Sequence, residues 1–208
     1  MLRPTTLPWR KPRHERLLLV LVAVAALTPV FVISTQDISH FCTTRAMESG
    51  HLVIESCAGN TIDIAQYNGY IYSNKAPGLA ALAVPAAEIT RLPPSSRWHF
   101  EEDRHLWAMR VLTNGIAFLV CAFLLGRVAE GIAAGTGALA VVGIALGTVT
   151  MPFAASGFDH VLTAAFGFGA FVLAWSRRPL LAGLCAGLSV AVEYEAAALL
   201  VLIGLYVL

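Results

Sequence analysis

Long apolar blocks dominate the chain, and polar residues gather in the segments between them. A helix needs about 20 mostly apolar residues to cross a hydrocarbon core about 30 Å thick. The blocks predict membrane-spanning helices over residues 17–35, 106–126, 131–152 and 158–175. The last block, 180–208, is interrupted by EYE at 193–195. Carboxylates are costly at membrane depth, so we expect two short spans that meet at this break, with one long kinked helix as the alternative.

Composition agrees with this pattern. Hydrophobic residues make up 57% of the chain and charged residues 13%, and the mean hydropathy is +0.71, outside the range of ordinary water-soluble domains. The net charge is +1, and basic residues are scattered singly apart from a cluster at 10–16, so nothing indicates nucleic-acid binding. The apolar run after this cluster lacks a small-x-small cleavage site, which favours an uncleaved signal-anchor over a cleaved signal peptide. The sequence predicts an all-α polytopic protein of the plasma (inner) membrane.

The basic residues also predict which side each loop faces, because they collect on the cytoplasmic side of short loops. With the N-terminus in the cytoplasm, Arg127, Arg177 and Arg178 also fall inside. The predicted organisation is a basic cytoplasmic N-terminus 1–16, a first span 17–35, an outer segment 36–105 and further spans over 106–208. Every acidic residue except Glu15 and Glu130 then lies on the outer side. The polar chemistry is therefore expected at the outer face.

The outer segment is too long to be a structureless connection. QDISHFCTTRAMESG predicts a short helix that stops at Gly50. LVIES and TIDIAQY predict extended pieces, and Asn68-Gly69 between IAQY and YIYS predicts a β-hairpin. PGLAALAVPAAEIT is apolar enough to form a second short helix at the membrane surface, broken at Pro85.

The cysteines and motif searches narrow the chemistry only slightly. Cys121 and Cys185 fall in predicted spans and are expected to be small apolar residues. Cys42 and Cys57 both face the outer compartment, where they could form a disulfide or remain free thiols. The sequence contains no CxxC, no His-rich pattern, no nucleotide-binding glycine loop and no GxSxG. No residue is therefore assigned as a metal ligand, although a divalent metal remains open.

Polar residues near the outer boundary are candidates for a site. Asp37 is either a helix N-cap or a carboxylate that accepts a proton from a substrate hydroxyl. Lys75, in YSNKAPG, is either a solvated turn residue or a ligand for a lipid phosphate. Tyr72 could pack under a sugar ring or anchor the membrane interface, and anchoring is the better interpretation.

Further candidates lie within the predicted spans. Arg110 could snorkel outward or hold a phosphate. Asp159 and His160 begin a span, where Asp159 is either a cap or part of a site. Glu193 and Tyr194 lie at the break in the last apolar block, and ionisable groups at this depth usually face a cavity or a partner.

Four blocks of the sequence resemble, in order and approximate spacing, those of bacterial class C (GT-C) membrane glycosyltransferases. They are TQDISHFCTTRAMESGHL, YSNKAPGLAALAVP, MPFAASGFDHVLTAAF and LLAGLCAGLSVAVEYEAAAL. The blocks resemble those of the protein mannosyltransferase and aminoarabinose transferase relatives, and the resemblance covers nearly the whole chain from about Leu17. It implies a GT-C-like N-terminal transmembrane bundle whose first outer loop contains short juxtamembrane helices. It also implies transfer of a sugar from a polyprenyl-phosphate carrier to a glycan, lipid or protein acceptor.

The resemblance assigns roles to individual residues. It implies that Asp37 is the catalytic carboxylate and that Lys75 binds the carrier phosphate. The other residues that it places near the cavity are Asp159, His160, Glu193 and Tyr194. Two positions depart from the family pattern: Ala76, where many relatives have a second proline, and Glu195, where a small residue or proline is expected.

Length is the larger departure, because family members usually continue for several more spans. A fragment, or a second polypeptide that supplies the remaining spans, would account for it. Two alternative function classes stay open: a non-catalytic membrane scaffold or inactive remnant of an enzyme, and a secondary transporter, which would carry polar groups along a path to both faces.

Overall fold

Helices make up most of the fold, as the apolar blocks predict. The computed structural model describes residues 13–28, 33–55, 57–90 and 101–207. Its α-helices are α1 Arg13–Ala26, α2 Thr35–Glu48, α3 Gly78–Ile89, α4 Glu101–Arg110, α5 Ile116–Ile132, α6 Gly137–Leu146, α7 Thr150–Ala154, α8 His160–Trp175, α9 Pro179–Val192 and α10 Ala197–Val207. The shorter elements are the 3-10 helices η1 Ala58–Asn60 and η3 Tyr194–Ala196, the π-helical turn η2 Val111–Gly115, and the strands β1 Ile64–Tyr67 and β2 Tyr70–Ser73.

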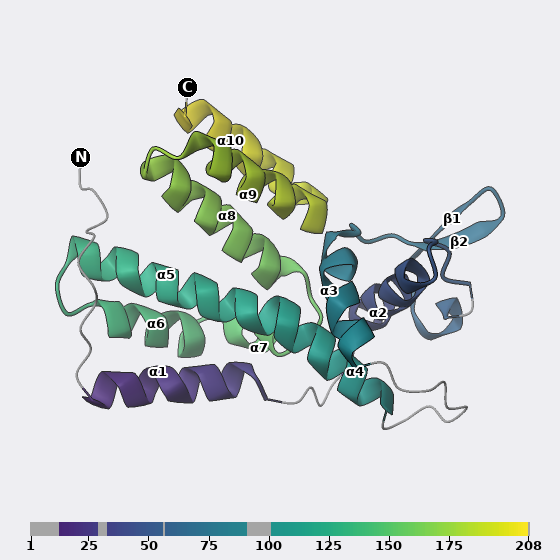
Figure 1. Ribbon diagram of the computed structural model, residues 1–208, viewed down its shortest axis with the longest axis horizontal. Coiled ribbons are helices and arrows are strands. Elements are labelled where there is room, and N and C mark those ends of the chain that lie inside the picture. The colour runs from purple at the N-terminus through teal and green to yellow at the C-terminus, as the bar shows by residue number, and fades with distance from the viewer. Residues whose placement is uncertain (1–12, 29–32, 56, 91–100, 208) are drawn as a thin grey trace.

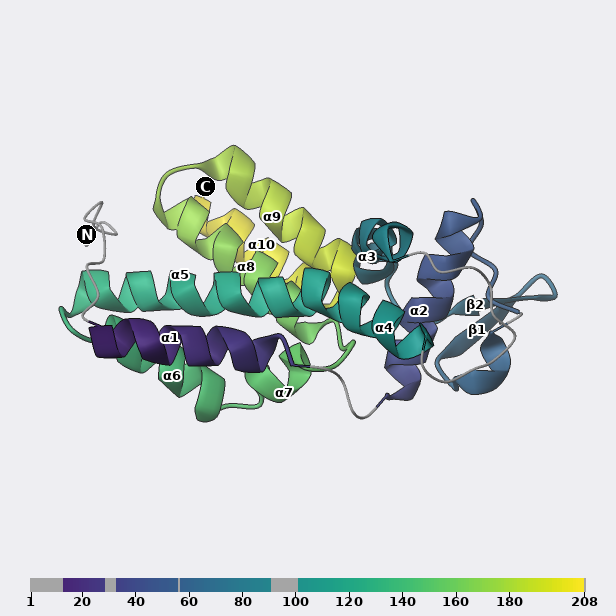
Figure 2. The ribbon, with the colours of Figure 1, turned by 60° about the horizontal axis from the view of Figure 1, so that its bottom comes forward.

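The molecule has two distinct ends. Helices α1, α5, α6, α8, α9 and α10 form a bundle, and α2, α3 and the β1–β2 hairpin lie beyond one end of it (Figure 1; Figure 2). The start of α1 and the α5–α6 and α8–α9 turns lie at the opposite end. Arg177 and Arg178 belong to the α8–α9 turn, whereas the EYE break follows α9 beside α3. The two segments thus lie at opposite ends of the bundle, while the predicted membrane sidedness stays a prediction; Arg10 and Lys11 lie outside the described residues.

Two predicted spans are wrong in extent. The helix predicted over 17–35 ends at Ala26, and α2 begins only at Thr35. Pro29 follows in the sequence, and a proline disfavours helical conformation in the residue before it. The span predicted over 131–152 divides into α6, which rises about 15 Å, and the short α7. Between them the Thr148 hydroxyl donates to the Ile144 carbonyl oxygen and accepts from the Thr150 N–H. At this turn a side chain therefore bonds backbone groups that would bond one another in a continuous helix.

Within the described residues, one helical segment is long and apolar enough to cross a membrane, judged by length and composition alone. It runs from His105 to Ile132 and contains the span predicted over 106–126. The span predicted over 158–175 corresponds to α8, one of several apolar helices of 10 to 17 residues. The predicted break at EYE is confirmed, because α9 ends at Val192 and α10 begins at Ala197.

Small residues line the contact between α8 and α9. Ala170 and Ala174 of α8 are buried against Ala182 and Ala186 of α9, with Ile203 of α10 in the same cluster. Small side chains let helix backbones approach closely, which is the usual way that helices associate in a membrane. A larger cluster joins α1, α3, α5, α6, α7, α8 and α9, and its fully buried centre includes Phe118, Val141 and Val192. The bundle is therefore one packed unit, and its packing fixes the positions in space of the ends of α8 and α9.

The outer segment follows its prediction in two elements. Helix α2 begins after Ser34, whose side chain caps it in a capping box with Asp37, and Gly50 follows its end with a φ of +78°. Strands β1 and β2 pair antiparallel on either side of Asn68-Gly69, both at positive φ, as a tight hairpin turn requires. LVIES is not a strand, although the Ile54 N–H donates to the Ile71 carbonyl.

The predicted break at Pro85 is wrong. Helix α3 continues through Pro85 from Gly78 to Ile89. Proline removes one backbone N–H, which leaves the carbonyl of Ala81 without its helical donor. Pro85 and Ala81 are both exposed, so this carbonyl faces the surroundings rather than the core, and the helix tolerates the proline.

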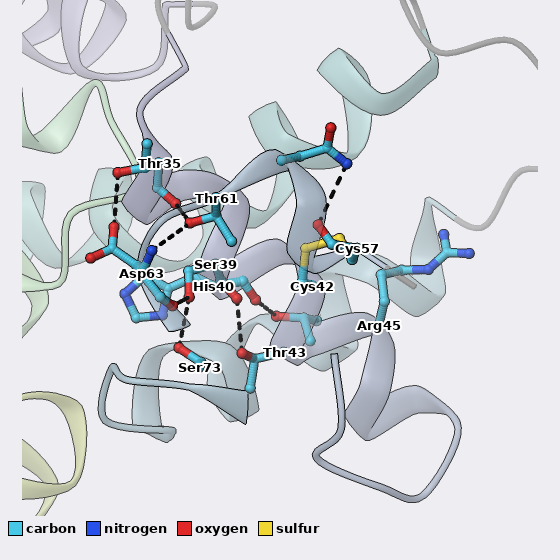
Figure 3. Close-up of a disulfide and its surroundings, with 12 residues drawn as sticks. Thr35, Ser39, His40, Cys42, Thr43, Arg45, Cys57, Thr61, Asp63 and Ser73 are labelled. Carbon is cyan, nitrogen blue, oxygen red and sulfur yellow. Dashed lines mark hydrogen bonds between the residues drawn. A yellow bond between two sulfur atoms is a disulfide. The ribbon is translucent and has the colours of Figure 1, made fainter. Parts of the chain in front are cut away.

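A disulfide joins Cys42 of α2 to Cys57, just before η1 (Figure 3). Of the two alternatives for these cysteines, a disulfide or free thiols, the disulfide is the one present. Hydrogen bonds reinforce the same junction: Thr35 donates to Asp63, and Ser39 donates to the backbone carbonyl of Asp63 (Figure 3). The cross-link closes a loop with a sequence separation of 15. A disulfide that closes a loop of about this length typically stabilises the folded protein by about 3 kcal/mol. The hairpin is thus held firmly to α2.

Candidate functional site

A pocket of about 220 Å³ opens where α2, the turn before α3, the start of α8 and the turn after α9 meet. Its lining residues are Gln36, Asn74, Lys75, Ala76, Asp159, His160, Glu193, Tyr194 and Glu195. Most of the residues predicted for the site are therefore brought together, although they come from segments far apart in the sequence. The exceptions are Asp37, Tyr72 and Arg110.

Gly78 explains why two of these segments meet. A Cβ atom at Gly78 would overlap the Ala191 carbonyl and lie 2.7 Å from the backbone nitrogen of Val192. Only glycine permits this approach between the start of α3 and the end of α9. Lys75 precedes Gly78 and Glu193 follows Val192, so the contact places the lysine turn beside the EYE break.

One wall of the pocket is a group of two carboxylates and a histidine. His160 Nδ1 lies 2.9 Å from Glu193 Oε1 and 3.5 Å from Asp159 Oδ1. Gln36 Nε2 donates to the same Asp159 oxygen at 2.9 Å. Asp159 stands at the N-cap position of α8, but its side chain makes no cap hydrogen bond, so the cap interpretation is wrong. Its carboxylate faces Gln36 and His160 instead.

Aromatic rings orient this histidine. The rings of Phe153 and Phe158 lie with centroids 5.5 Å and 5.9 Å from that of His160, one edge-on and the other stacked. Such contacts restrict how the imidazole can turn. The ligand atoms of Asp159, His160 and Glu193 all lie within 4.8 Å of one another. This group could hold a metal ion, which the sequence alone did not indicate.

The other wall carries Lys75. Its Nζ lies 3.1 Å from Asp63 Oδ1, and the Thr35 hydroxyl donates to Asp63 Oδ2 at 2.8 Å. The lysine side chain is 27% exposed, so it is a positioned ammonium rather than a freely solvated one. The interpretation as a freely solvated turn residue is therefore wrong, and the phosphate-binding role stays a prediction.

The charge state of Asp63 maintains this position. Burial raises the pKa of Asp63, but the hydrogen bonds from Thr35 and Lys75 and the charge of Lys75 together outweigh it, so the pKa lies below its usual value. Because the folded-state pKa is lowered, the pair stabilises the fold above the usual aspartate range, and this stabilisation is lost only as the pH falls through the lowered pKa. At neutral pH Lys75 therefore stays paired.

Asp37, the predicted catalytic carboxylate, lies outside the pocket lining. It is 5% exposed, and it accepts from the Ser34 N–H at 2.7 Å, from the Ser34 hydroxyl and from the Gly157 N–H. Ser34 is the N-cap of α2, so the alternative interpretation of Asp37 as the N-cap is wrong. Asp37 instead closes the capping box and ties α2 to the turn before α8.

Arg110 is turned inward rather than snorkelling outward. It is 3% exposed, and it donates to the carbonyls of Ala26 and Ala154 at 2.9 Å and to that of Thr28. These carbonyls belong to the end of α1 and to α7. Tyr72 lies on β2, half-buried, beyond the pocket wall. Neither residue contacts the space where a ligand would lie.

Several polar groups from different elements converge on the turn that carries Asp159 and His160. Asp37 holds the Gly157 N–H, Arg110 holds the Ala154 carbonyl, and Asn114 donates to the carbonyls of Ser156 and Phe158. Asn114 belongs to η2, a π-helical turn, and such turns often occur beside functional sites. These residues position the site from behind.

Gln36, His40 and Asp63 were not among the residues predicted for the site. A usable signal existed for the first two, because buried polar residues recur on α2 at helical spacing: Gln36, Ser39, His40, Thr43 and Thr44. A polar stripe that faces the core indicates hydrogen bonding or a site. Asp63 gave only a weak signal, as one acidic residue in an alternating strand pattern.

Comparisons with protein families, curated proteins and solved structures found no match for this chain.

Proposed function

We propose that this chain is a multi-pass plasma-membrane glycosyltransferase of the GT-C kind. It moves a sugar from a polyprenyl-phosphate carrier to an acceptor hydroxyl at the outer face. One observation carries the proposal: a positioned lysine and a carboxylate–histidine group face a single pocket, at the end of the bundle opposite the basic turns.

The exposed surface supports immersion in a membrane. Large apolar side chains stay exposed along both α1 and α10: Leu17, Leu18, Val20, Leu21, Val24, Val201, Leu202, Leu205 and Tyr206. Soluble monomers rarely expose contiguous apolar surface of this extent. Lipid is the solvent that makes such surfaces stable, and the outer pocket then lies near the membrane boundary, where a lipid-linked donor presents its phosphate.

The transfer needs a cation at the leaving group. The acceptor oxygen bonds to the anomeric carbon while the bond from that carbon to the phosphate oxygen breaks, and the electron pair stays on the phosphate. Negative charge therefore grows on that oxygen in the transition state. Lys75, which Asp63 holds in position, stabilises this charge. It therefore stabilises the transition state more strongly than the ground state.

The acceptor hydroxyl must also lose its proton. Glu193 lines the pocket and its side chain is 21% exposed, so it can reach a ligand there. We assign Glu193 as the base that accepts this proton, and His160 as the residue that orients Glu193. Glu193 replaces the base predicted at Asp37, because the oxygens of Asp37 are occupied by N–H and O–H donors. Ligand pockets usually measure about 300–1,000 Å³, so one of 220 Å³ suits a phosphate and part of a sugar, with the lipid tail outside.

A transfer assay in native membranes tests this function. Membranes that contain the chain receive polyprenyl-phosphate-mannose or polyprenyl-phosphate-aminoarabinose labelled in the sugar. We expect label to leave the lipid carrier and appear in an acceptor fraction, with release of polyprenyl phosphate. Membranes without the chain serve as the control. Equal turnover with and without the chain, for both donors, would contradict the proposal and favour a scaffold or a transporter.

A further inference from the structure

The group formed by Asp159, His160 and Glu193 has the dimensions of a metal site with three protein ligands. Zinc bonds to imidazole nitrogen and carboxylate oxygen measure about 2.0–2.2 Å, so ligand atoms around a tetrahedral ion lie about 3.4 Å apart. His160 Nδ1 lies 2.9 Å and 3.5 Å from the two carboxylate oxygens, which brackets that separation. All the ligand atoms fall within 4.8 Å of one another, so a small inward movement of the carboxylates completes the geometry.

We infer that these residues bind a divalent transition-metal cation, with one coordination position open to the pocket. Two carboxylates and a neutral imidazole match the charge of a divalent ion. Imidazole favours zinc and its neighbours over magnesium and calcium, which prefer oxygen ligands alone. Three protein ligands with a free position are typical of reactive rather than purely structural zinc sites.

His40 lies against Asp159 and outside the pocket lining. It is 2% exposed, and neither of its ring nitrogens has a hydrogen-bond partner. Its Nε2 lies 3.7 Å from Asp159 Oδ2, the carboxylate oxygen turned away from His160. Leaving a buried polar group unpaired destabilises the fold. A metal that draws Asp159 Oδ1 inward leaves Oδ2 for His40, which then acts as a positioning residue behind the ligand.

The identity of the ligand at the open coordination position rests on the proposed function. The pocket places Lys75 and the metal-ligand group around the same space. A donor phosphate oxygen would bind the ion while Lys75 neutralises the remaining charge. Glu193 would bind through Oε1, which leaves Oε2 for the proton of the acceptor.

Metal binding is measured on the purified full chain after chelator treatment, with no sugar donor present. We expect about one equivalent of Zn²⁺ by calorimetry, since ligands must converge in the folded state, and intense visible bands with Co²⁺ as a spectroscopic probe. His160→Ala and Glu193→Gln should each weaken binding by at least about tenfold, and His40→Gln by about 10–100-fold. His51→Ala is the matched control, because His51 is an exposed histidine of the same outer segment. It should bind metal like the parent.

Thermal unfolding without metal shows whether each variant is folded, and Glu193→Gln keeps the test open if His160→Ala is not. Absence of stoichiometric binding, or equal binding by the parent, His160→Ala and Glu193→Gln, overturns the inference and leaves an ion-paired histidine. An affinity unchanged in His40→Gln removes the support drawn from that residue and contradicts its assigned role. The proposed function is judged separately: Lys75-dependent transfer that persists in chelator would retain the enzyme and reject a role for the metal in transfer.

Discussion

Replacement of Lys75 by alanine is expected to lower sugar transfer by about 10²–10³-fold, the usual loss when one group that stabilises developing negative charge is removed. Lys75 is the cation that lines the pocket, and Asp63 and Thr35 hold it in place. Without it the departing phosphate loses the compensating charge that the ammonium group supplies. The measurement is release of polyprenyl phosphate at saturating donor, so that weaker binding is separated from slower transfer.

Two further variants sharpen this prediction. Arg178→Ala removes a cation at the opposite end of the bundle and should transfer sugar at the parent rate. Asp63→Asn keeps the ammonium but weakens its positioning, so we expect a smaller loss than for Lys75→Ala. If Lys75→Ala transferred sugar as fast as Arg178→Ala, the phosphate-binding role would be wrong.

Replacement of Gly78 by alanine is expected to destabilise the fold by about 1–3 kcal/mol, the usual cost of forcing extra atoms into a closely packed contact. The added methyl would meet backbone atoms of Ala191 and Val192 rather than a flexible side chain. To relieve the overlap, α3 must move away from α9. Because this contact brings Lys75 to Glu193, transfer and metal binding should fall together with stability.

Gly183→Ala is the matched control for this variant. Gly183 lies in α9, and a Cβ at that position would meet nothing within 4 Å. Alanine is favoured over glycine inside a helix by about 1 kcal/mol, so this variant should be as stable as the parent or more so. Thermal unfolding in detergent compares the two. A Gly78→Ala protein as stable as Gly183→Ala would mean that α3 and α9 do not meet as described.

Local features of the sequence predicted local structure well. The Asn68-Gly69 turn, α2 and the break at EYE all depend on residues close together in the chain, and all three are present. The spans at 17–35 and 131–152 were drawn too long, because hydropathy registers neither the conformational effect of Pro29 nor a side chain such as Thr148 that competes for backbone groups.

The composition of the pocket could be predicted only in part. Lys75 and Glu193 stood out as charged residues in apolar surroundings, and sidedness placed them at one end. The roles of Asp37 and Arg110 depend on contacts with Gly157 and Ala154, far away in the sequence, and no local pattern indicates such partners. Asp37, the expected catalytic carboxylate, and Arg110, an expected phosphate ligand, are instead buried and support the turn that carries Asp159.

The most direct test asks whether the lysine turn and the EYE break share one face of the membrane. Asn74 and Tyr194 are exposed residues of the pocket wall, and Arg178 lies in the turn at the opposite end. Single variants Asn74→Cys, Tyr194→Cys and Arg178→Cys are treated with a membrane-impermeant maleimide on intact spheroplasts, with the free cysteines Cys121 and Cys185 replaced by serine. We expect labelling at positions 74 and 194 from outside, and at 178 only after permeabilisation. Labelling of 74 and 194 from opposite sides would contradict a common outer pocket.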